Sequence, residues 1–340
     1  RMSRIRIGMM GLGQIGRQIF RLALADERFE VVAVSDIGQP EILRHLLDKD
    51  MGRGAGVRLE DNSLVSAGSR ARLLSSAKPG EIPWDVFGVD FVIDATGRFR
   101  SRDDLAPHLD SGAARVVTSM LPVDDIDRVV LFGVNDGEMA PEDRIVSAGS
   151  ASTTATALAL RVLSRRYAIE HATMTSVHAY TSDQSLQDYA GADYRRSRSG
   201  ARNIIPNDTP ALRWIQRLLP QLRGRMTAYA LNVPVQTGSM LDITVSLKDG
   251  KAEIDEVREL FRQAARAKPE LIETTDDPIV SSDVRDCGKS LLVDLKGCMP
   301  AGARMLKILA WHESLGHARR ILDVVGAYAK IDGNRKREAA

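Results

Sequence analysis

A glycine-rich turn near the amino terminus constrains the fold of this 340-residue chain more than any other feature. The turn reads Gly11-Leu12-Gly13-Gln14-Ile15-Gly16, and it joins a strand-like apolar run at 5–10 to apolar residues at helical spacing, Ile15, Ile19 and Leu22. The first glycine permits a tight turn, the second lets the backbone approach a pyrophosphate, and the third lets helix and strand pack closely. The sequence therefore predicts a strand–turn–helix unit that holds a dinucleotide at Gly11, Gly13, Gln14, Ile15 and Gly16.

Asp36 stands 20 residues beyond Gly16, at the end of the next predicted strand. A carboxylate at this place can accept hydrogen bonds from a ribose hydroxyl and repels a 2′-phosphate, which favours NAD over NADP as the cofactor. Thr96, Gly97 and Ser119 follow two later strands and are expected to line the same cleft, although each also fits ordinary turn chemistry.

The pattern of apolar residues predicts an α/β chain with two domains. Short β-branched runs alternate with helical patterns in the first half, which indicates a parallel sheet covered by helices. The strands expected there are 5–10, 31–34, 91–93, 116–117 and 129–132. From about residue 155 the pattern of apolar and polar residues becomes typical of an α+β domain with a mainly antiparallel sheet. The elements expected in it are a helix at 156–167, strands at 173–178, 243–247 and 291–295, and a helix at 254–267.

Composition excludes several classes of partner. The net charge of +2 is too small to predict nucleic acid or an anionic membrane as a partner, and the longest apolar runs are only strand-sized. Cys287 and Cys298 are the only cysteines, and their spacing fits neither a disulfide framework nor a metal site. We therefore expect a cytoplasmic protein that binds no metal, nucleic acid or membrane.

Seven motifs along nearly the whole chain resemble, in order, those of the glyceraldehyde-3-phosphate dehydrogenases. They are 11–17 (GLGQIGR), 94–97 (DATG), 132–135 (FGVN), 176–181 (SVHAYT), 203–206 (NIIP), 233–234 (VP) and 281–283 (SSD). The resemblance implies a Rossmann NAD-binding domain at 1–151 and a catalytic domain at 152–316. It also implies a C-terminal helix at about 317–331 that returns to the first domain, and usually a homotetramer.

The departures from the family pattern concern its chemistry. Where the family has its nucleophile in S-N-A-S-C-T-T-N, residues 148–155 read AGSASTTA, so Ser152 takes the cysteine position. Asn232 replaces an arginine that binds substrate phosphate in the family, and Pro210 replaces a glycine near its inorganic-phosphate site. Ser314 is the counterpart of the asparagine that holds the nicotinamide.

The resemblance assigns roles to the residues that remain. Ser152 and His178 take the catalytic positions. The substrate or phosphate positions fall to Ser150, Thr153, Thr181, Asp183, Arg198, Thr209 and Asn232. The neighbouring Arg195 and Arg196 are expected to be solvated or to face another subunit. His312 and His317 are expected to be surface polar groups.

Three functional interpretations follow. The chain is an NAD-dependent oxidoreductase that acts on an aldehyde or sugar phosphate without a thioester, with His178 as the base. Alternatively it is a catalytically silent NAD-binding homologue, a sensor or assembly subunit. The third is an engineered Cys-to-Ser form of an active dehydrogenase, although Gly149, Ala155, Asn232 and Ser314 also depart from the family. No carboxylate that would orient His178 is evident in the sequence.

Overall fold

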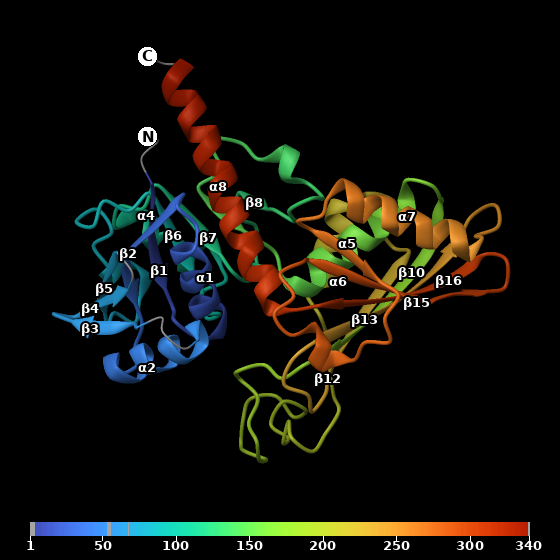
Figure 1. Ribbon diagram of the computed structural model, residues 1–340, viewed down its shortest axis with the longest axis horizontal. Helices are drawn as coiled ribbons and strands as arrows, with labels where there is room; N and C mark the ends of the chain where they lie inside the picture. The colour runs from blue at the N-terminus through green and yellow to red at the C-terminus, as the bar shows by residue number, and fades with distance from the viewer. Residues whose placement is uncertain (1–3, 53–55, 67, 339–340) are drawn as a thin grey trace. The chain divides into compact units, whose positions relative to one another are not determined.

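The computed structural model describes residues 4–52, 56–66 and 68–338, apart from the side chains of 335–338. The chain divides into two compact units (Figure 1). One runs to Gly149 and resumes at Ala318, and the other comprises Ser150–His317. The domain boundaries expected after residues 151 and 316 lie within two residues of these breaks.

The first unit is built on a mixed sheet. Its strands are β1 (Ile5–Met10), β2 (Phe29–Ser35), β3 (Arg58–Glu60), β4 (Ser63–Ser66), β5 (Ser69–Leu74), β6 (Phe91–Asp94), β7 (Arg115–Thr118), β8 (Arg128–Val129) and β9 (Ile145–Ser147). Over the described residues the order is β3-β4-β5-β2-β1-β6-β7-β9-β8, antiparallel at β3-β4-β5 and parallel elsewhere. Because the chain leaves β1 toward β2 on one side and β6 lies on the other, the strand order reverses at β1, where ligands bind in such sheets.

The helices of this unit complete its core. They are α1 (Gln14–Leu24), α2 (Pro40–Met51), the short α3 (Arg102–Leu105) and α4 (Pro107–Asp110), and α8 (Ser314–Glu338) from Ala318 onward. Ile321 and Val325 of α8 are buried in the same cluster as Ile7 of β1 and Ile93 of β6. The last helix is therefore part of the core of the first unit.

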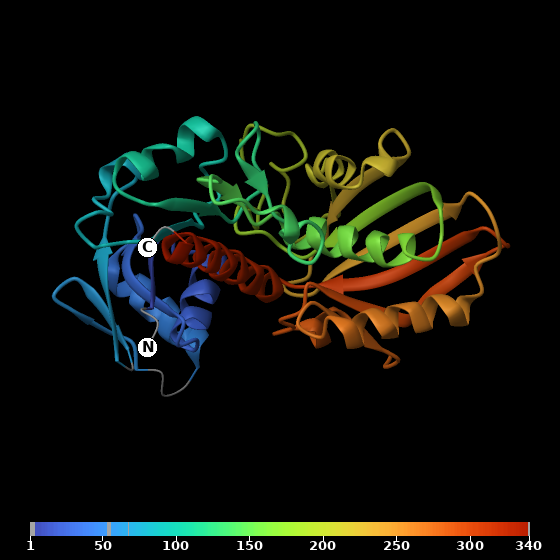
Figure 2. The ribbon, with the colours of Figure 1, turned by 90° about the horizontal axis from the view of Figure 1, so that it is seen from above.

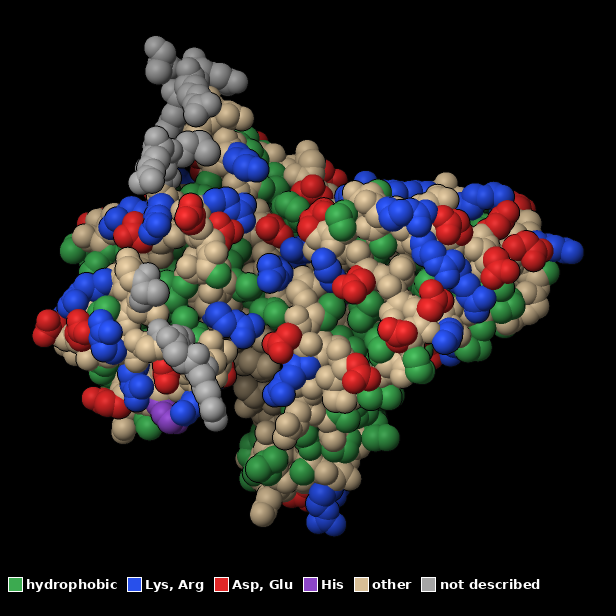
Figure 3. Space-filling view, viewed as in Figure 1, with side chains coloured by type: hydrophobic (Ala, Val, Ile, Leu, Met, Phe, Trp, Pro, Cys, Tyr) green, Lys and Arg blue, Asp and Glu red, His purple; other side chains and the backbone are tan. Residues whose placement is uncertain are grey.

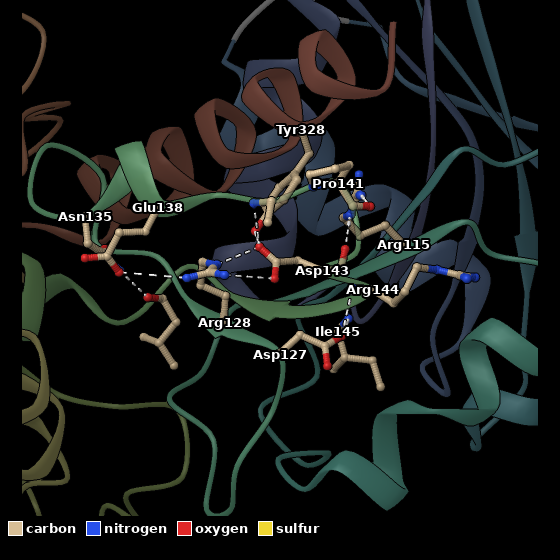
Figure 4. A network of polar contacts seen from close by, with 12 residues as sticks. Arg115, Asp127, Arg128, Asn135, Glu138, Pro141, Asp143, Arg144, Ile145 and Tyr328 are labelled. Carbon is tan, nitrogen blue, oxygen red and sulfur yellow. Dashed lines mark hydrogen bonds and ion pairs between the residues drawn. The ribbon is translucent and has the colours of Figure 1, made fainter. Parts of the chain in front are cut away.

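A polar network also holds α8 (Figure 4). The hydroxyl of Tyr328 donates to Asp143 at 2.7 Å, and Nε of Arg128 donates to the same carboxylate at 2.6 Å. Burial alone would raise the pKa of Asp143, but these two hydrogen bonds, together with one from the backbone of Ala140 and the charge of Arg128, outweigh burial and hold that pKa below its usual value. The Arg115 guanidinium lies 4.3 Å from the ring centre of Tyr328 and donates to Asp332 at 2.6 Å.

The second unit has a mainly antiparallel sheet. Its elements are α5 (Ala151–Ser164), β10 (Ile169–His178), β11 (Ile205–Asn207), α6 (Ala211–Leu218), β12 (Met226–Asn232), β13 (Ser239–Leu247), α7 (Ile254–Ala267), β14 (Ile272–Thr275), β15 (Leu291–Ala301) and β16 (Met305–His312). In the described part of the chain the order is β11-β12-β10-β13-β16-β15-β14, with only β10-β12 and β14-β15 parallel. The helices α5 and α7 pack against this sheet and against each other (Figure 2).

The predicted fold class, an N-terminal Rossmann-type domain followed by a domain with a mainly antiparallel sheet, is confirmed. Some of the predicted helix ends were wrong. Helix α5 begins at Ala151 and not at 156, because Oγ of Ser150 caps it by accepting from the N–H of Thr153 at 3.3 Å. The segment 332–337, whose polar and charged composition is typical of a frayed tail, continues α8 to Glu338. No helix of the described residues is long and apolar enough to cross a membrane.

Candidate active site

The glycine turn after β1 has the shape that a pyrophosphate requires. Gly11 has a φ of +95°, and a Cβ there would lie 2.8 Å from the backbone of Ala95 and Thr96. A Cβ at Gly16 would collide with the carbonyl oxygen of Gly11. At Gly13, the N-cap of α1, a Cβ would meet nothing within 4 Å. The protein itself therefore requires glycine at Gly11 and Gly16, whereas Gly13 leaves open space at the helix N-terminus.

The start of α1 suits an anion. No side chain caps this helix and its first turn holds no acidic residue, so the N–H groups of its first turn are available to a ligand. Gln14 is exposed at this end and Ile15 is half-buried. These residues fit the pyrophosphate of a dinucleotide.

Asp36 follows β2 and braces the same turn. Its carboxylate accepts from the backbone N–H of Leu12 at 2.7 Å and from that of Gly38 at 2.8 Å. A carboxylate has about four acceptor positions, so two remain for ribose hydroxyls. Asp36 can therefore both hold the turn and recognise a ribose.

The other predicted cofactor residues lie at the carboxyl ends of β6 and β7. Thr96 donates from its backbone and its hydroxyl to Asp94, at 3.0 and 2.7 Å. Gly97 has a φ of +69° and is exposed, and the buried Ser119 donates its N–H to the carbonyl of Asp94 at 2.9 Å. Because β1, β6 and β7 are parallel neighbours, these residues and the glycine turn share one edge of the sheet.

Ser152 lies in the first turn of α5 in the second unit. It is half-buried, and its hydroxyl forms no hydrogen bond with any described residue. The hydroxyls on either side are engaged, because Oγ of Ser150 and Oγ1 of Thr153 are 2.7 Å apart. Within the described part of the chain, Ser152 therefore has no hydrogen-bonded base that would activate its oxygen.

His178 ends β10 and is oriented by backbone. Its Nδ1 lies 2.7 Å from the carbonyl oxygen of Ala179, so Nδ1 of the neutral ring carries the proton and donates it. Nε2 then keeps its lone pair and can accept a proton. A carbonyl takes the orienting role that a carboxylate has in serine hydrolases.

Pairing across four neighbouring strands brings polar residues to the end of β10. In the parallel pair β10-β12, Asn232 is directly opposite His178. On the other side, the hydroxyl of Ser239 on β13 accepts from the N–H of Ala179 at 3.2 Å, and Ser239 pairs with His312 of β16. The sheet therefore lines up Asn232, His178, Ser239 and His312.

His312 is a buried member of this row. His312 and His317 are 2% and 6% exposed, so the expectation that they are surface groups is wrong. The rings of His312 and His178 meet edge to face with centroids 5.9 Å apart, and no described residue bonds Nε2 of His312. Burial, together with the imidazoles of His178 and His317, lowers the pKa of His312 to about 3, which keeps it neutral.

Arg196, expected to be solvated or to face another subunit, is half-buried and bonded to residues that the resemblance assigns to substrate binding. Its guanidinium donates to Asp183, to Oγ1 of Thr181 at 3.4 Å and to Oδ1 of Asn207 at 3.2 Å. Burial alone would raise the pKa of Asp183, but hydrogen bonds from Thr181 and Arg196 hold that pKa below its usual value. In the sequence, Arg196 was marked only as a member of the basic cluster Arg195, Arg196, Arg198 and Arg202.

Arg198 and Thr209 have other hydrogen-bond partners. Arg198 donates to Asp188 at 3.0 Å, and both side chains are largely exposed. Oγ1 of Thr209 accepts from the N–H of Ala211 at 3.2 Å, at the start of α6. Among the described contacts, neither bonds Thr181, Asp183 or Asn232.

Ser314 begins α8 and is held by Glu313. One Glu313 oxygen accepts from both the N–H and the hydroxyl of Ser314, at 3.1 and 3.0 Å. The other accepts from the N–H of Gly238 at 2.7 Å. A serine in this setting is shorter than the family's asparagine and already has a partner.

Neither cysteine supplies the missing thiolate. Sγ of Cys298 is buried and donates to the carbonyl of Asp294 at 3.3 Å, and burial raises the pKa of Cys298 to about 11. Cys287 packs beside Trp311, and burial raises its pKa as well. A nucleophilic cysteine needs a lowered pKa, so both are structural.

Comparison with known proteins agrees with this geometry. Residues 5–102 match the family model for the glyceraldehyde 3-phosphate dehydrogenase NAD binding domain, and residues 150–314 match the model for its C-terminal domain. Glyceraldehyde-3-phosphate dehydrogenase 1 of Bacillus cereus is 33% identical over 96% of this chain and 99% of its own length. Glyceraldehyde-3-phosphate dehydrogenase 2 of Streptomyces arenae is 37% identical over 94% of this chain and 97% of its own length. Glyceraldehyde-3-phosphate dehydrogenase of Mycobacterium leprae is 35% identical over 96% of this chain and 99% of its own length. The predicted resemblance and the predicted cofactor, NAD, are confirmed.

Proposed function

Because the chain belongs to the glyceraldehyde-3-phosphate dehydrogenase family, we propose that it is an NAD-dependent oxidoreductase that oxidises a small aldehyde without forming a thioester. One observation carries the proposal: His178 is held with its proton on Nδ1, 2.7 Å from the carbonyl of Ala179, and its Nε2 lone pair is available. The aldehyde would react as its hydrate, which needs a base but no protein nucleophile.

The chain's own residues move one proton in this scheme. Nε2 of His178 accepts the proton of a hydrate hydroxyl as the carbon is oxidised to a carboxylic acid. The Nδ1–H bond to the carbonyl of Ala179 stabilises the imidazolium that forms. When bound at Gly11–Gly16 and Asp36, NAD supplies the hydride acceptor.

Ser152 is not a covalent nucleophile in this proposal. A serine hydroxyl is a far weaker acid than a thiol, and Ser152 has no hydrogen-bonded base among the described residues. An ester at Ser152 would also resist cleavage by phosphate more than a thioester does. The phosphorylating reaction is therefore lost.

The test is formation of NADH from a panel of short aldehydes in buffer without phosphate. We expect steady turnover in the purified protein and a loss of about 10²- to 10⁴-fold in His178→Ala. His171→Ala, at an exposed position on the same strand, is the control and should keep the wild-type rate. Intact-protein mass spectrometry during turnover should find no acyl adduct. A rate unchanged in His178→Ala, or an acyl group on Ser152, would refute the scheme.

The second candidate is a catalytically silent NAD-binding homologue. The observation that favours it is the engagement of Ser314 by Glu313, at the position that holds the nicotinamide in the family. Tight binding of NAD by calorimetry, with no turnover of any aldehyde, would support this candidate. Turnover with any aldehyde would exclude it.

We also propose a cytoplasmic homotetramer. The loop between β10 and β11 exposes large apolar side chains, among them Tyr194 at 97%, Leu186 at 72% and Ile204 at 64%. Figure 3 shows hydrophobic side chains gathered over this loop. Large exposed apolar patches mark interaction sites, contacts between subunits among them. Sedimentation analysis of the wild type should give a tetramer, and the double variant Tyr194→Asp, Leu186→Asp should dissociate more readily. A monomeric wild type would refute the proposed tetramer. Cell fractionation tests the location.

A further inference from the structure

Three side-chain amides, those of Gln184, Asn207 and Asn232, form a hydrogen-bonded chain that we call the amide cluster. Nδ2 of Asn207 donates to Oδ1 of Asn232 at 2.5 Å, and Nδ2 of Asn232 donates to Oε1 of Gln184 at 2.9 Å. The backbone N–H of Thr181 donates to the same Gln184 oxygen at 2.9 Å. Toward described residues, Asn232 thus uses one of its two N–H groups and one of its two lone pairs. The amide cluster therefore retains both a donor and an acceptor.

The amide cluster lies beside the proposed base. Asn232 is the register partner of His178 in the parallel pair β10-β12. Paired residues of neighbouring strands point to the same face of a sheet, and the strands are about 4.8 Å apart. A three-carbon aldehyde whose reacting carbon lies at His178 can reach Asn232 with a group on its last carbon.

The charges next to the amide cluster cancel. The Arg196 guanidinium donates to Asn207 and is the cation in contact with the cluster. The same guanidinium is paired with the carboxylate of Asp183, so the pair sums to zero (+1 − 1). A phosphate ester placed here would have to compete with Asp183 for Arg196.

Two other arginines of the loop are directed elsewhere. Arg198 is paired with Asp188 at 3.0 Å. Arg195 donates to the hydroxyl of Tyr229 at 2.8 Å, and Tyr229 stands three residues before Asn232 on β12. Since side chains alternate along a strand, Tyr229 points to the opposite face from Asn232. Neither arginine therefore adds positive charge to the amide cluster.

We infer that the amide cluster binds a hydroxyl group of the substrate, so that the substrate class is a short, uncharged hydroxyaldehyde and not a sugar phosphate. A hydroxyl both donates and accepts hydrogen bonds, as the amides do. A phosphate dianion only accepts, and it would face the open lone pair of Asn232 and the carboxylate of Asp183 without a proton to offer them. The inference rests on the proposed oxidoreductase function for the reacting end of the substrate, whereas the binding of the distal end is tested separately.

The first experiment uses the wild-type protein with NAD. The value of kcat/KM for D-glyceraldehyde should exceed that for D-glyceraldehyde 3-phosphate by about tenfold or more, because the phosphate meets unpaired acceptors. In calorimetry, sn-glycerol 3-phosphate should give no binding heat up to about 10 mM. A preference for the phosphate ester, or binding of sn-glycerol 3-phosphate below about 1 mM, would overturn the inference.

The second experiment adds a cation to the amide cluster. Asn232→Arg should shift the kcat/KM ratio toward the phosphate ester by about tenfold or more and should create binding of sn-glycerol 3-phosphate. Asn334→Arg, which adds the same charge at an exposed position of α8, should change neither. Circular dichroism verifies that each variant is folded. If Asn232→Arg does not fold, the wild-type ratio and calorimetry decide alone.

The two proposals fail in different ways. If neither aldehyde is turned over, the oxidoreductase proposal falls, and calorimetry with sn-glycerol 3-phosphate still decides what the amide cluster accepts. If the phosphate ester is the better substrate, the oxidoreductase proposal stands and the inference about the amide cluster is refuted.

Discussion

Replacing His312 by phenylalanine should make the protein more resistant to acid. The pKa of His312 is lowered from 6.5 to about 3 by burial and by the neighbouring imidazoles of His178 and His317. In the unfolded chain the pKa is the ordinary 6.5, so between pH 6.5 and 3 the unfolded state binds a proton that the folded state does not. The folded state therefore loses stability as the pH falls through this window, and loses none above it.

The size of the effect follows from the pKa difference. One pKa unit corresponds to about 1.4 kcal/mol, so the difference of about 3.5 units (6.5 − 3) gives a loss of about 5 kcal/mol at pH 3. At pH 5, about 1.5 units below the unfolded pKa, the loss is about 2 kcal/mol in the free energy of unfolding. At pH 7.5 it is close to zero.

The free energy of unfolding is measured at pH 7.5 and at pH 5 by urea titration, with tryptophan fluorescence and circular dichroism as the two probes. Each transition is fitted separately, because a chain of two units need not unfold in one step. Between the two pH values, the wild type should lose about 2 kcal/mol more than His312→Phe. His171→Gln removes an exposed imidazole and should behave as the wild type. His312→Gln serves if phenylalanine disturbs the packing. Equal losses in all proteins, or an NMR titration of His312 near pH 6.5, would refute the reasoning.

Three further changes test the first unit. The added methyl group of Gly13→Ala would meet open space, so the melting temperature should stay unchanged. The affinity for NAD, measured by calorimetry, should fall about tenfold or more, and an unchanged affinity would argue against pyrophosphate binding at the glycine turn. Asp36→Asn should lower the preference for NAD over NADP, measured as the ratio of dissociation constants, and a ratio that stays the same would contradict its ribose role. Tyr328→Phe removes the bond to Asp143 and should cost about 1–3 kcal/mol of unfolding free energy in urea, an effect that an unshifted midpoint would disprove.

Local signals predicted the first unit well. The glycine turn, the strand before it and the spacing of Ile15 and Ile19 depend on contacts within a few residues, and the structure has β1 and α1 there. The course of 332–337 was not predictable in this way. Its charged composition indicates a tail, whereas the contact that holds Asp332 is made by Arg115, far away in the sequence.

In the second unit the position of a side chain depended on strand pairing. The histidine at His178 was identified from its motif, and the geometry adds the carbonyl of Ala179 that orients it. The burial of His312 follows from the pairing of β16 with β13, which no local pattern reveals. The choice between Arg196 and Arg198 depends on how one irregular loop folds back on itself, and such loops carry no periodicity to read.

The place of α8 has a consequence for synthesis. Ile321, Val325 and Tyr328 belong to the same interior as residues of β1, yet the ribosome makes them only after the whole of the second unit. The amino-terminal half of the chain thus emerges without the final layer of its own interior, whereas Ser150–His317 is complete as soon as it has left the exit tunnel. Since domains generally fold as units during translation, the unit encoded second is expected to finish folding first.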